Sequence, residues 1–547
     1  MTSKLAPGSS LRGAGSRVVR SVAGFGLPRG LPLLVSGVLV CAAGVAAAGP
    51  RLHRLGASTV LLPAASGGLF GRSLTTCDMN GDGFADVAVG GRSAVFVHLG
   101  GPDGVSATPA AELGDGDPLS AFGGALSCGD ANGDGFGDLL VGAPSATVGA
   151  DTQAGRAVLF DGGPAGPAPT PGWELAGAGV AGFVGLSVDA AGDVNGDGFD
   201  DLAVGGPSVQ VFLGGASGPG VLPTAVLDVP ATALATADVN GDGLDDLAIA
   251  ESRADGAAFD VGRVAVYAGS GDGVAAAALV SFEGQEEGAL LGSALANAGD
   301  VDGDGFDDLL IGAPDLDMNA GRDAAVYLVM GGPGGPDGLG DALRAASDVL
   351  TYGASLAGLG DTDADGHADF LVGAYNDGSG VGRVDVHLGP TAAWPADAVD
   401  TLAGEPGDFF GFALAGGDVN GDGYADALIG APQARPDGQP QTGQVTVFLG
   451  YADADEDGAI VGGGSGTPQD CDDTRADVFP GAEEVMGDGV DQDCDGADLP
   501  ADASDRDGPE ADGDKSAGCA TAPSGALPPL AGGLLGVVLV ARGRRRR

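Results

Sequence analysis

The chain has little positive charge. Its 547 residues include 24 Lys or Arg against 76 Asp or Glu, for a formal net charge of −52. Ten of the basic residues lie before residue 30 or after residue 541, and all of the acids lie between these points, so the central chain carries a charge near −62. Such a surface repels phosphate groups, which argues against nucleic acid and anionic membranes as partners of the central chain.

Histidine is scarce too, and the sequence offers no candidate catalytic residue. The four histidines stand outside any recognisable catalytic motif: His53, His98, His367 and His387. Asp and Glu are so frequent that no glycosidase-like pair of carboxylates can be singled out.

Glycine, in contrast, is abundant. The chain has 106 Gly and 33 Pro, with 44% hydrophobic residues. That hydrophobic share is too high for a disordered chain, and the glycine content favours many short strands joined by turns.

One nine-residue stretch occurs seven times. Its clearest copy is Asp193-Val194-Asn195-Gly196-Asp197-Gly198-Phe199-Asp200-Asp201, followed by an apolar run. Each copy has Asp at position one, Asn or Asp at three, Asp at five, Gly at six and Asp at nine. The copies begin at Asp78, Asp130, Asp193, Asp238, Asp300, Asp361 and Asp418.

This pattern predicts calcium binding. Side-chain oxygens at positions one, three and five, with a backbone carbonyl at seven, are hard ligands that suit Ca²⁺, and Gly at six allows a sharp turn. The first half resembles an EF-hand loop, but position twelve is Val or Ile in every copy, so the acid at nine must close the site. The alternative is seven Asp/Gly-rich turns without a metal, although turns alone do not require Asp at alternate positions.

The predicted calcium ligands comprise five residues from each loop. They are Asp78, Asn80, Asp82, Phe84, Asp86, Asp130, Asn132, Asp134, Phe136, Asp138, Asp193, Asn195, Asp197, Phe199, Asp201, Asp238, Asn240, Asp242, Leu244, Asp246, Asp300, Asp302, Asp304, Phe306, Asp308, Asp361, Asp363, Asp365, His367, Asp369, Asp418, Asn420, Asp422, Tyr424 and Asp426.

The loops belong to a repeat array that extends over residues 58–451. Consecutive loops begin 45 to 63 residues apart, which leaves room for four short strands in each repeat. An alternating stretch such as Gly262–Tyr267 is typical of a half-buried strand. Four-stranded units that cannot bury their faces alone indicate an all-β fold, a seven-bladed β-propeller.

The repeats also resemble a known family. Phe122-Gly123 before the acidic loop and Gly142-Ala143-Pro144 after it are similar to the FG-GAP repeat of integrin α-chain propellers. The resemblance implies seven blades, calcium in the hairpin between the first two strands, and a role in adhesion or recognition. Some copies depart from it: the fourth lacks Phe-Gly and ends in Ala250, and Leu291-Gly292 and Tyr352-Gly353 replace Phe-Gly in the fifth and sixth.

The seventh repeat lacks a fourth strand of its own. After Gly450 the chain turns acidic, whereas a suitable strand, Ser58–Leu62, precedes the first repeat. We expect that segment to pair with Gln444–Leu449 and close the ring, since an open array would expose strand edges.

Residues 1–48 are predicted to be an export signal. Basic residues come first, an apolar run extends from Leu31 to Ala48, and Ala46-Ala47-Ala48 offers a small-residue cleavage site. The alternative is a membrane anchor that stays in place.

Residues 453–497 are predicted to form a small acidic module. The segments around Cys471 and Cys494 resemble a metal-binding repeat of secreted myxobacterial-type proteins. So small a core would need a Cys471–Cys494 disulfide and calcium to hold it. The alternative is a disordered acidic linker, which is the interpretation of residues 498–517.

Residues 518–547 form the tail. Cys519, the apolar stretch Ala526–Ala541 and a terminal Arg cluster together resemble a myxobacterial C-terminal sorting signal. This resemblance implies processing near Cys519 and attachment of the mature protein at the cell surface, so that membrane contact is restricted to the tail or its processed anchor. A plain C-terminal membrane anchor is the alternative.

Two further cysteines, Cys77 and Cys128, precede equivalent loops in neighbouring repeats. Their offsets from the loop Asp differ by one residue, which places them on opposite faces of equivalent strands. Whether they form a disulfide stays open at this point.

Together these features predict an exported, surface-attached, calcium-binding propeller, monomeric, that recognises a glycan or protein ligand. A polysaccharide lyase or hydrolase and a structural spacer are the alternatives. Binding residues concentrate in variable loops on rigid scaffolds, and here those loops lie opposite the calcium hairpins. Their polar residues include Asp151, Asp315, Asp317, Asn319, Asn376 and Asp377.

Overall fold

The computed structural model describes the repeat array almost completely. The described residues are 56–63, 68–314, 324–340, 342–344, 349, 351–362, 366–376, 380–389, 398–436, 441–450, 478, 490 and 492. The predicted export signal, the Cys471–Cys494 pair and Cys519 lie outside them. Among the described residues, no helix has the length and apolar character needed to cross a membrane.

The described residues form strands in seven antiparallel sheets. In chain order the strands are β1 (Gly56–Leu61), β2 (Ser73–Cys77), β3 (Asp86–Gly90), β4 (Val95–His98), β5 (Ala111–Leu113), β6 (Ala125–Gly129), β7 (Asp138–Ala143), β8 (Arg156–Phe160), β9 (Trp173–Ala176), β10 (Val188–Gly192), β11 (Asp201–Val204), β12 (Val209–Phe212), β13 (Ala225–Leu227), β14 (Ala233–Ala237), β15 (Asp246–Glu251), β16 (Arg263–Tyr267), β17 (Val280–Glu283), β18 (Leu295–Gly299), β19 (Asp308–Ala313), β20 (Ala325–Val329), β21 (Ala342–Arg344), β22 (Ser355–Gly360), β23 (Asp369–Ala374), β24 (Arg383–His387), β25 (Asp400–Ala403), β26 (Ala413–Gly417), β27 (Asp426–Ala431) and β28 (Gln444–Leu449).

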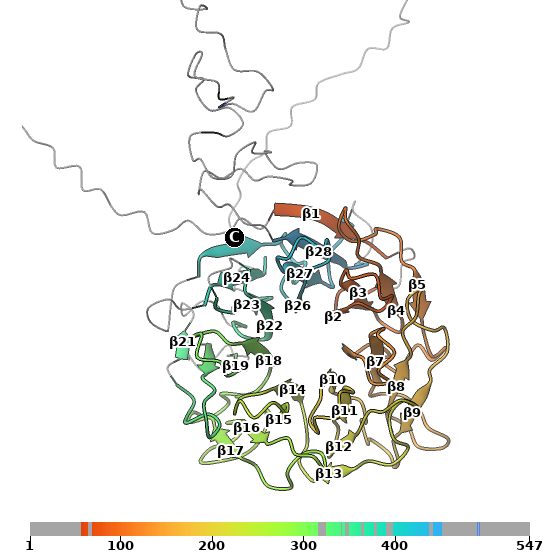
Figure 1. The fold of residues 1–547 in the computed structure, drawn as a ribbon, viewed down its shortest axis with the longest axis vertical. Coiled ribbons are helices and arrows are strands. Elements are labelled where there is room, and N and C mark those ends of the chain that lie inside the picture. Colours follow the sequence, from red (N-terminus) through yellow and green to blue (C-terminus); the bar gives the residue numbers. More distant parts are fainter. Residues whose placement is uncertain are drawn as a thin grey trace, which may run out of the picture. The chain divides into compact units, whose positions relative to one another are not determined.

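Each sheet is one blade of a propeller. Six sheets contain four consecutive strands, beginning with β2-β3-β4-β5, and the seventh has the order β1-β28-β27-β26. The first strand of each blade contacts the first strand of the next, from β2 through β26 and back to β2. Figure 1 shows these strands surrounding the centre of the ring. The predicted all-β, seven-bladed fold is confirmed.

The hydrophobic core lies between adjacent blades. Strand β7 buries every one of its residues, although it belongs to a single sheet. Its Leu139 and Val141 pack with Val97 of the first blade and with Phe122. Both faces of a blade therefore need a neighbour, which explains why the second strands are continuous apolar runs rather than alternating ones.

The N-terminal strand completes the seventh blade. Strand β1 pairs antiparallel with β28, with Leu61 opposite Val445 and Val60 opposite Thr446. Leu61 is fully buried there. The pairing is the one expected from the sequence, and it joins the two ends of the array within one sheet.

The Phe-Gly motif places a buried side chain beside a glycine with positive φ. Phe122 and Phe410 are buried, as are Leu291 and Tyr352 where the motif departs from Phe-Gly. In the third blade Val184-Gly185 takes this place, a departure from Phe-Gly that was not predicted from the sequence. The preceding residue also has positive φ in five blades, at Leu69, Ala121, Phe183, Leu290 and Phe409.

Cys77 and Cys128 form a disulfide between the first two blades, with their Cα atoms 6.1 Å apart. The one-residue difference between the positions of Cys77 and Cys128 relative to their loops, which left this pairing open, in fact favours the disulfide. Adjacent blades meet through opposite faces of equivalent strands, so two side chains meet when they lie on opposite faces of β2 and β6.

Candidate metal centres in the hairpin loops

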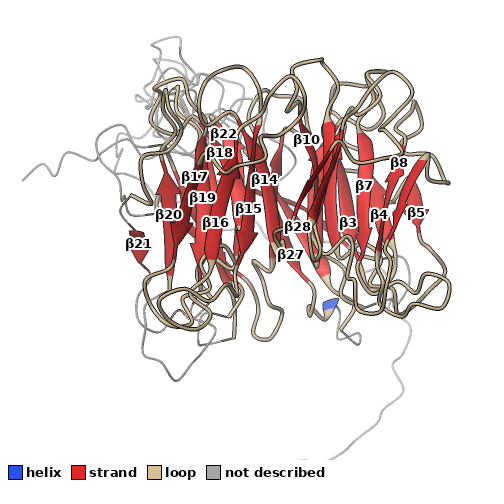
Figure 2. Ribbon diagram, turned by 90° about the horizontal axis from the view of Figure 1, so that it is seen from below, coloured by secondary structure: helices blue, strands red, loops and turns tan. Residues whose placement is uncertain are grey.

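The seven acidic loops lie on one face of the ring, named here the hairpin face. Each joins the first and second strands of a blade, and the turn after the third strand lies beside it. In the second blade, for example, Gly162 of that turn donates a backbone hydrogen bond to Asp138 at 2.8 Å. Figure 2 shows the strands running between two faces lined by loops. The opposite face carries the loops between second and third strands.

The Asp at position one shapes each loop. Asp78 Oδ1 accepts hydrogen bonds from the backbone N–H groups of Gly81 (2.6 Å) and Asp82 (3.1 Å), and its Oδ2 accepts one from Gly83 (2.8 Å). The same three bonds recur at Asp130, Asp193, Asp238 and Asp418. The loop backbone therefore curves around the carboxylate of position one.

Positions three and five bring further oxygens to the same point. In the first loop, Asn80 Nδ2 donates to Asp82 Oδ2 at 2.8 Å, while Asn80 Oδ1 accepts from the Asp82 N–H at 2.9 Å. In the fifth loop, where position three is an acid, carboxylate oxygens of Asp300, Asp302 and Asp304 lie within 4.8 Å of one another. Three carboxylates at this separation suit a shared cation.

The Asp at position nine is buried beneath the loop. Asp138, Asp308 and Asp426 have no exposed surface. In all seven blades one oxygen of this Asp accepts the N–H of the glycine in the neighbouring turn, at 2.7–2.9 Å. In six blades the other oxygen accepts the N–H of position two. The ninth residue therefore ties the hairpin to the adjacent turn.

Burial makes the charge on these aspartates costly. It raises the pKa of Asp138, Asp201, Asp308 and Asp426 to about 7, and that of Asp86 and Asp246 to about 6; the neighbouring loop acids add to the shift in each case. A cation bound in the loop would favour the ionised form.

Within the described ranges, the arginine ion pairs use acids outside the loops. Arg156 pairs with Asp115 and Glu174, and Arg263 with Glu251 and Glu283. The donor set of the loops, hard oxygens around a buried carboxylate, fits a divalent cation. Of the predicted ligands, Asp363 and Asp365 lie outside the described residues.

Neighbouring loops are joined around the ring by backbone hydrogen bonds. The N–H of position eight donates to the carbonyl oxygen of position one in the preceding loop, as from Gly137 to Asp78 (2.8 Å) and from Ala85 to Asp418 (2.9 Å). This bond recurs at six of the seven boundaries among the described residues, at 2.8–3.2 Å. These bonds thus link neighbouring loops around most of the ring, which the sequence did not predict.

The side chain at position seven packs on the preceding loop. A Cβ atom added to Gly133 would lie 2.5 Å from Phe199 Cε1, and one added to Gly81 would lie 2.7 Å from Phe136 Cε1. His367, predicted as a backbone ligand, belongs to this series: its ring lies over Gly303, and its Nδ1 is 3.1 Å from the Val301 carbonyl oxygen. The recurring glycine at position four was the sequence feature that could have predicted this packing, because a larger residue there would leave no room for the ring.

Two other histidines are core residues. His98 is fully buried, with Nδ1 2.8 Å from the Ser106 carbonyl oxygen, and its burial lowers its pKa. His387 stacks on Phe370 with ring centroids 5.1 Å apart and contacts the Tyr352 hydroxyl at 3.2 Å. Neither faces an open site.

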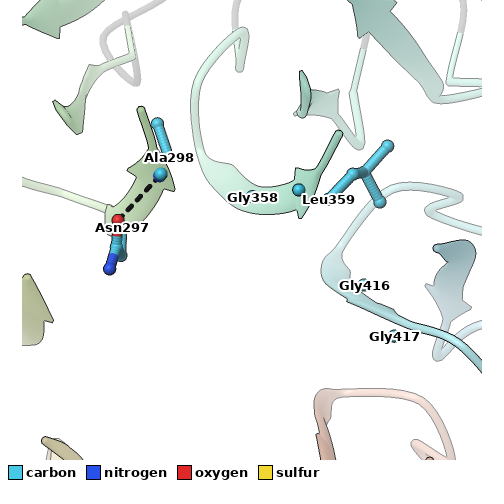
Figure 3. Close-up of a pocket in the computed structure, with 8 residues that line it drawn as sticks. Asn297, Ala298, Gly358, Leu359, Gly416 and Gly417 are labelled. Carbon is cyan, nitrogen blue, oxygen red and sulfur yellow. Dashed lines mark hydrogen bonds between the residues drawn. The ribbon is translucent and has the colours of Figure 1, made fainter. Parts of the chain in front are cut away.

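A hollow of about 340 Å³ opens on the inner strands of blades five, six and seven. Figure 3 shows Asn297 and Leu359 beside it, with Gly416 and Gly417 along its wall. The lining residues are otherwise Gly and Ala, and the Asn297 amide already bonds Asp307 and the Gly299 N–H. This hollow offers no convergent set of reactive groups.

The residues predicted for ligand binding are only partly described. Asp151 Oδ2 accepts the N–H of Gly179 at 3.0 Å, and the Asn376 N–H donates to Thr351 Oγ1 at 2.8 Å. Asp315, Asp317, Asn319 and Asp377 lie outside the described residues. Aromatic side chains gather beside Asn376: the Tyr375 ring lies 5.5 Å from that of Phe409 and 5.1 Å from that of Phe412.

Fold and loops together define a β-propeller with an acidic hairpin loop in every blade. The FG-GAP repeat model matches residues 70–98, 122–160, 184–219, 231–267, 291–329 and 410–448. The chain therefore contains a seven-bladed propeller in which six blades match the FG-GAP repeat, and the sixth blade, β22–β25, has the same four-stranded fold. A second model, described as "Putative metal-binding motif", matches residues 470–498.

Curated proteins that are similar to this chain include integrin α-chains. Human integrin alpha-IIb is 40% identical over 149 residues, which are 24% of this chain and 14% of that protein. Integrin alpha-5 of Xenopus laevis is 31% identical over 208 residues (37% and 16%), and integrin alpha-PS2 of Drosophila melanogaster is 36% identical over 176 residues (28% and 12%). The chain thus spans about one seventh of the length of these relatives.

A solved structure of BBS1N in complex with ARL6DN aligns with a TM-score of 0.44 at 11% identity, over 72% of this chain and 98% of that chain.

Proposed function

We propose that this protein is an exported, surface-attached propeller that binds calcium in its hairpin loops and recognises a glycan or protein ligand. The observation that carries the proposal is the repeated loop geometry. In every fully described loop the position-one Asp accepts the N–H of the glycine at position six, and in the fifth loop carboxylate oxygens of Asp300, Asp302 and Asp304 lie within 4.8 Å of one another. Relatedness to integrin α-chains supports a role in adhesion or ligand recognition.

Calcium suits these loops better than a transition metal. The side-chain donors are carboxylate and amide oxygens, which calcium binds with several ligands in flexible geometry. Bound calcium would neutralise part of the negative charge that the acids of each loop concentrate. It would also hold the hairpin against the neighbouring turn, because Asp138 and its equivalents already join the two.

The face opposite the hairpins is the proposed ligand site. Its loops differ from blade to blade, whereas the hairpin face repeats one motif seven times. The cluster of Tyr375, Phe409 and Phe412 lies there, and Phe412 is 37% exposed. Aromatic rings next to polar loop residues are suited to sugar rings and to peptides alike.

A glycan array tests this function. The full chain is applied with calcium and with a chelator, and we expect calcium-dependent binding to a restricted set of glycans. Loss of glycan from the array surface with release of shorter products would instead indicate a lyase or hydrolase.

Once a ligand is known, variants locate its site. Replacing Asp315, Asn376 and Asp377 with Ala should abolish binding and leave the melting temperature nearly unchanged. The matched control removes two exposed acids from turns of the hairpin face, Asp103→Ala with Asp272→Ala, and should keep full binding. The opposite pattern would place the ligand on the hairpin face.

Surface attachment is proposed through the tail. The Cys519→Ala variant should lose attachment and accumulate in an unprocessed form that still contains the terminal Arg cluster. Surface labelling of intact cells, with mass spectrometry of the C-terminal peptide, measures both. Normal labelling of that variant would rule out processing at Cys519.

A further inference from the structure

We propose that Asp200, Asp245 and Asp307 are positioning residues that couple metal binding between neighbouring blades. This inference depends on the proposed binding of calcium in the loops. It adds that the loops of blades two to five do not bind independently, whereas those at other boundaries are coupled less strongly.

Each of these acids bridges two loops. All three occupy position eight, directly before the buried Asp at position nine. Their carboxylates accept the backbone N–H of the position-one Asp in the preceding loop: Asp200 from Asp130 at 2.7 Å, Asp245 from Asp193 at 2.8 Å, and Asp307 from Asp238 at 3.3 Å. Asp307 also accepts the Asn297 amide at 3.0 Å.

The other loops lack this side chain. Position eight is Ala85, Gly137, Ala368 or Ala425 in the remaining loops. The boundary between blades seven and one still has the backbone bond from Ala85 to Asp418, and Phe84 still packs on Gly421. This boundary therefore lacks the bridging carboxylate found between blades three and four, and its position-seven side chain is Phe84 where that boundary has Leu244. Blades one and two are joined by the disulfide instead.

The bridge connects two predicted ligands. Asp193 holds its own loop through three backbone bonds, and its N–H is held by Asp245. Asp245 in turn precedes Asp246, which a cation in the fourth loop would fix in place. A cation in either loop thus orders the residue that orients the other loop, and such coupling of binding free energies is reciprocal.

Calcium titration of the full chain, followed by hydrogen exchange of peptides that cover each loop, measures the midpoint of each site separately. Asp242→Ala disables the fourth loop and should raise the calcium midpoint of the third loop about fivefold or more. As the matched control, Asp82→Ala disables the first loop, and the midpoint of the seventh loop should then shift less than about twofold.

Asp245→Ala reproduces the residue found naturally at the control boundary. It should raise the midpoint of the third loop by itself and make that loop insensitive to Asp242→Ala. If Asp242→Ala reduces the yield of folded protein, the milder Asp242→Asn takes its place.

The outcomes are distinct. The coupling is overturned if the calcium midpoint of the third loop is unchanged by both Asp242→Ala and Asp245→Ala. It is also overturned if Asp82→Ala shifts the midpoint of the seventh loop as much as Asp242→Ala shifts that of the third. Absence of any calcium-dependent protection in the wild-type loops overturns the proposed function instead.

Discussion

Replacing one glycine at the contact between neighbouring loops should destabilise the ring more than replacing another glycine in the same loop. Gly133, at position four, has a φ of +71°, and an added Cβ would lie 2.5 and 2.8 Å from Phe199 Cε1 and Cδ1. Gly135, at position six, has a φ of +85° with no atom within 4 Å of an added Cβ. Both N–H groups bond to Asp130.

The two substitutions share one cost and differ in another. Placing alanine in the left-handed region costs about 1–2 kcal/mol at either position. Gly133→Ala additionally forces the Phe199 ring away from a packed interface, and overpacking of this kind costs about 1–3 kcal/mol. Gly133→Ala should therefore destabilise the protein more than Gly135→Ala by that second amount.

Urea denaturation of both variants, at equal saturating calcium, measures this difference. A second pair of variants separates the clash with the Phe199 side chain from the backbone strain. In a Phe199→Ala background, Gly133→Ala should lower the free energy of unfolding no more than Gly135→Ala does. Equal destabilisation by the two substitutions in the wild-type background would refute the proposed contact between position seven and position four.

Three further results are expected. Chelation of calcium-loaded protein should lower the melting temperature by many degrees, because a ligand at 100 times its dissociation constant contributes about 2.7 kcal/mol at each site; an unchanged melt in excess EDTA would argue against metal binding. Deleting Ser58–Leu62 should leave β28 as an open edge and cause aggregation, seen by light scattering, whereas a monomer that melts like the parent would argue against closure by β1. Replacing Cys77 and Cys128 with Ala should lower the free energy of unfolding by about 2–4 kcal/mol in urea denaturation, and no change would mean that the bridge adds nothing to stability.

Much of the fold could be predicted because each repeat carries the same strand and loop patterns in its own sequence. Alternation in segments such as Gly262–Tyr267 predicts the strands, and seven acidic loops that begin 45 to 63 residues apart predict the number of blades. The missing fourth strand of the last repeat pointed to Ser58–Leu62, and β1 pairs there. Each of these signals is local, or follows from counting one unit seven times.

The features that could not be predicted from the sequence are contacts between neighbouring blades. The Cys77–Cys128 bond was left open because the two residues lie on opposite faces of equivalent strands, yet those faces meet between adjacent blades. Similarly, position seven was interpreted only as a backbone ligand, although Phe199 and His367 pack on the preceding loop. Contacts between repeats leave no pattern within one repeat.

Anomalous diffraction tests the central claim, calcium binding by the hairpin loops, most directly. Crystals of the full chain grown in saturating calcium are measured at a long wavelength, where calcium scatters anomalously. The account predicts a peak in each of the seven loops, about 2.3–2.6 Å from the carboxylate oxygens of positions one, five and nine. Well-ordered loops without peaks, or peaks confined to other parts of the chain, would contradict it.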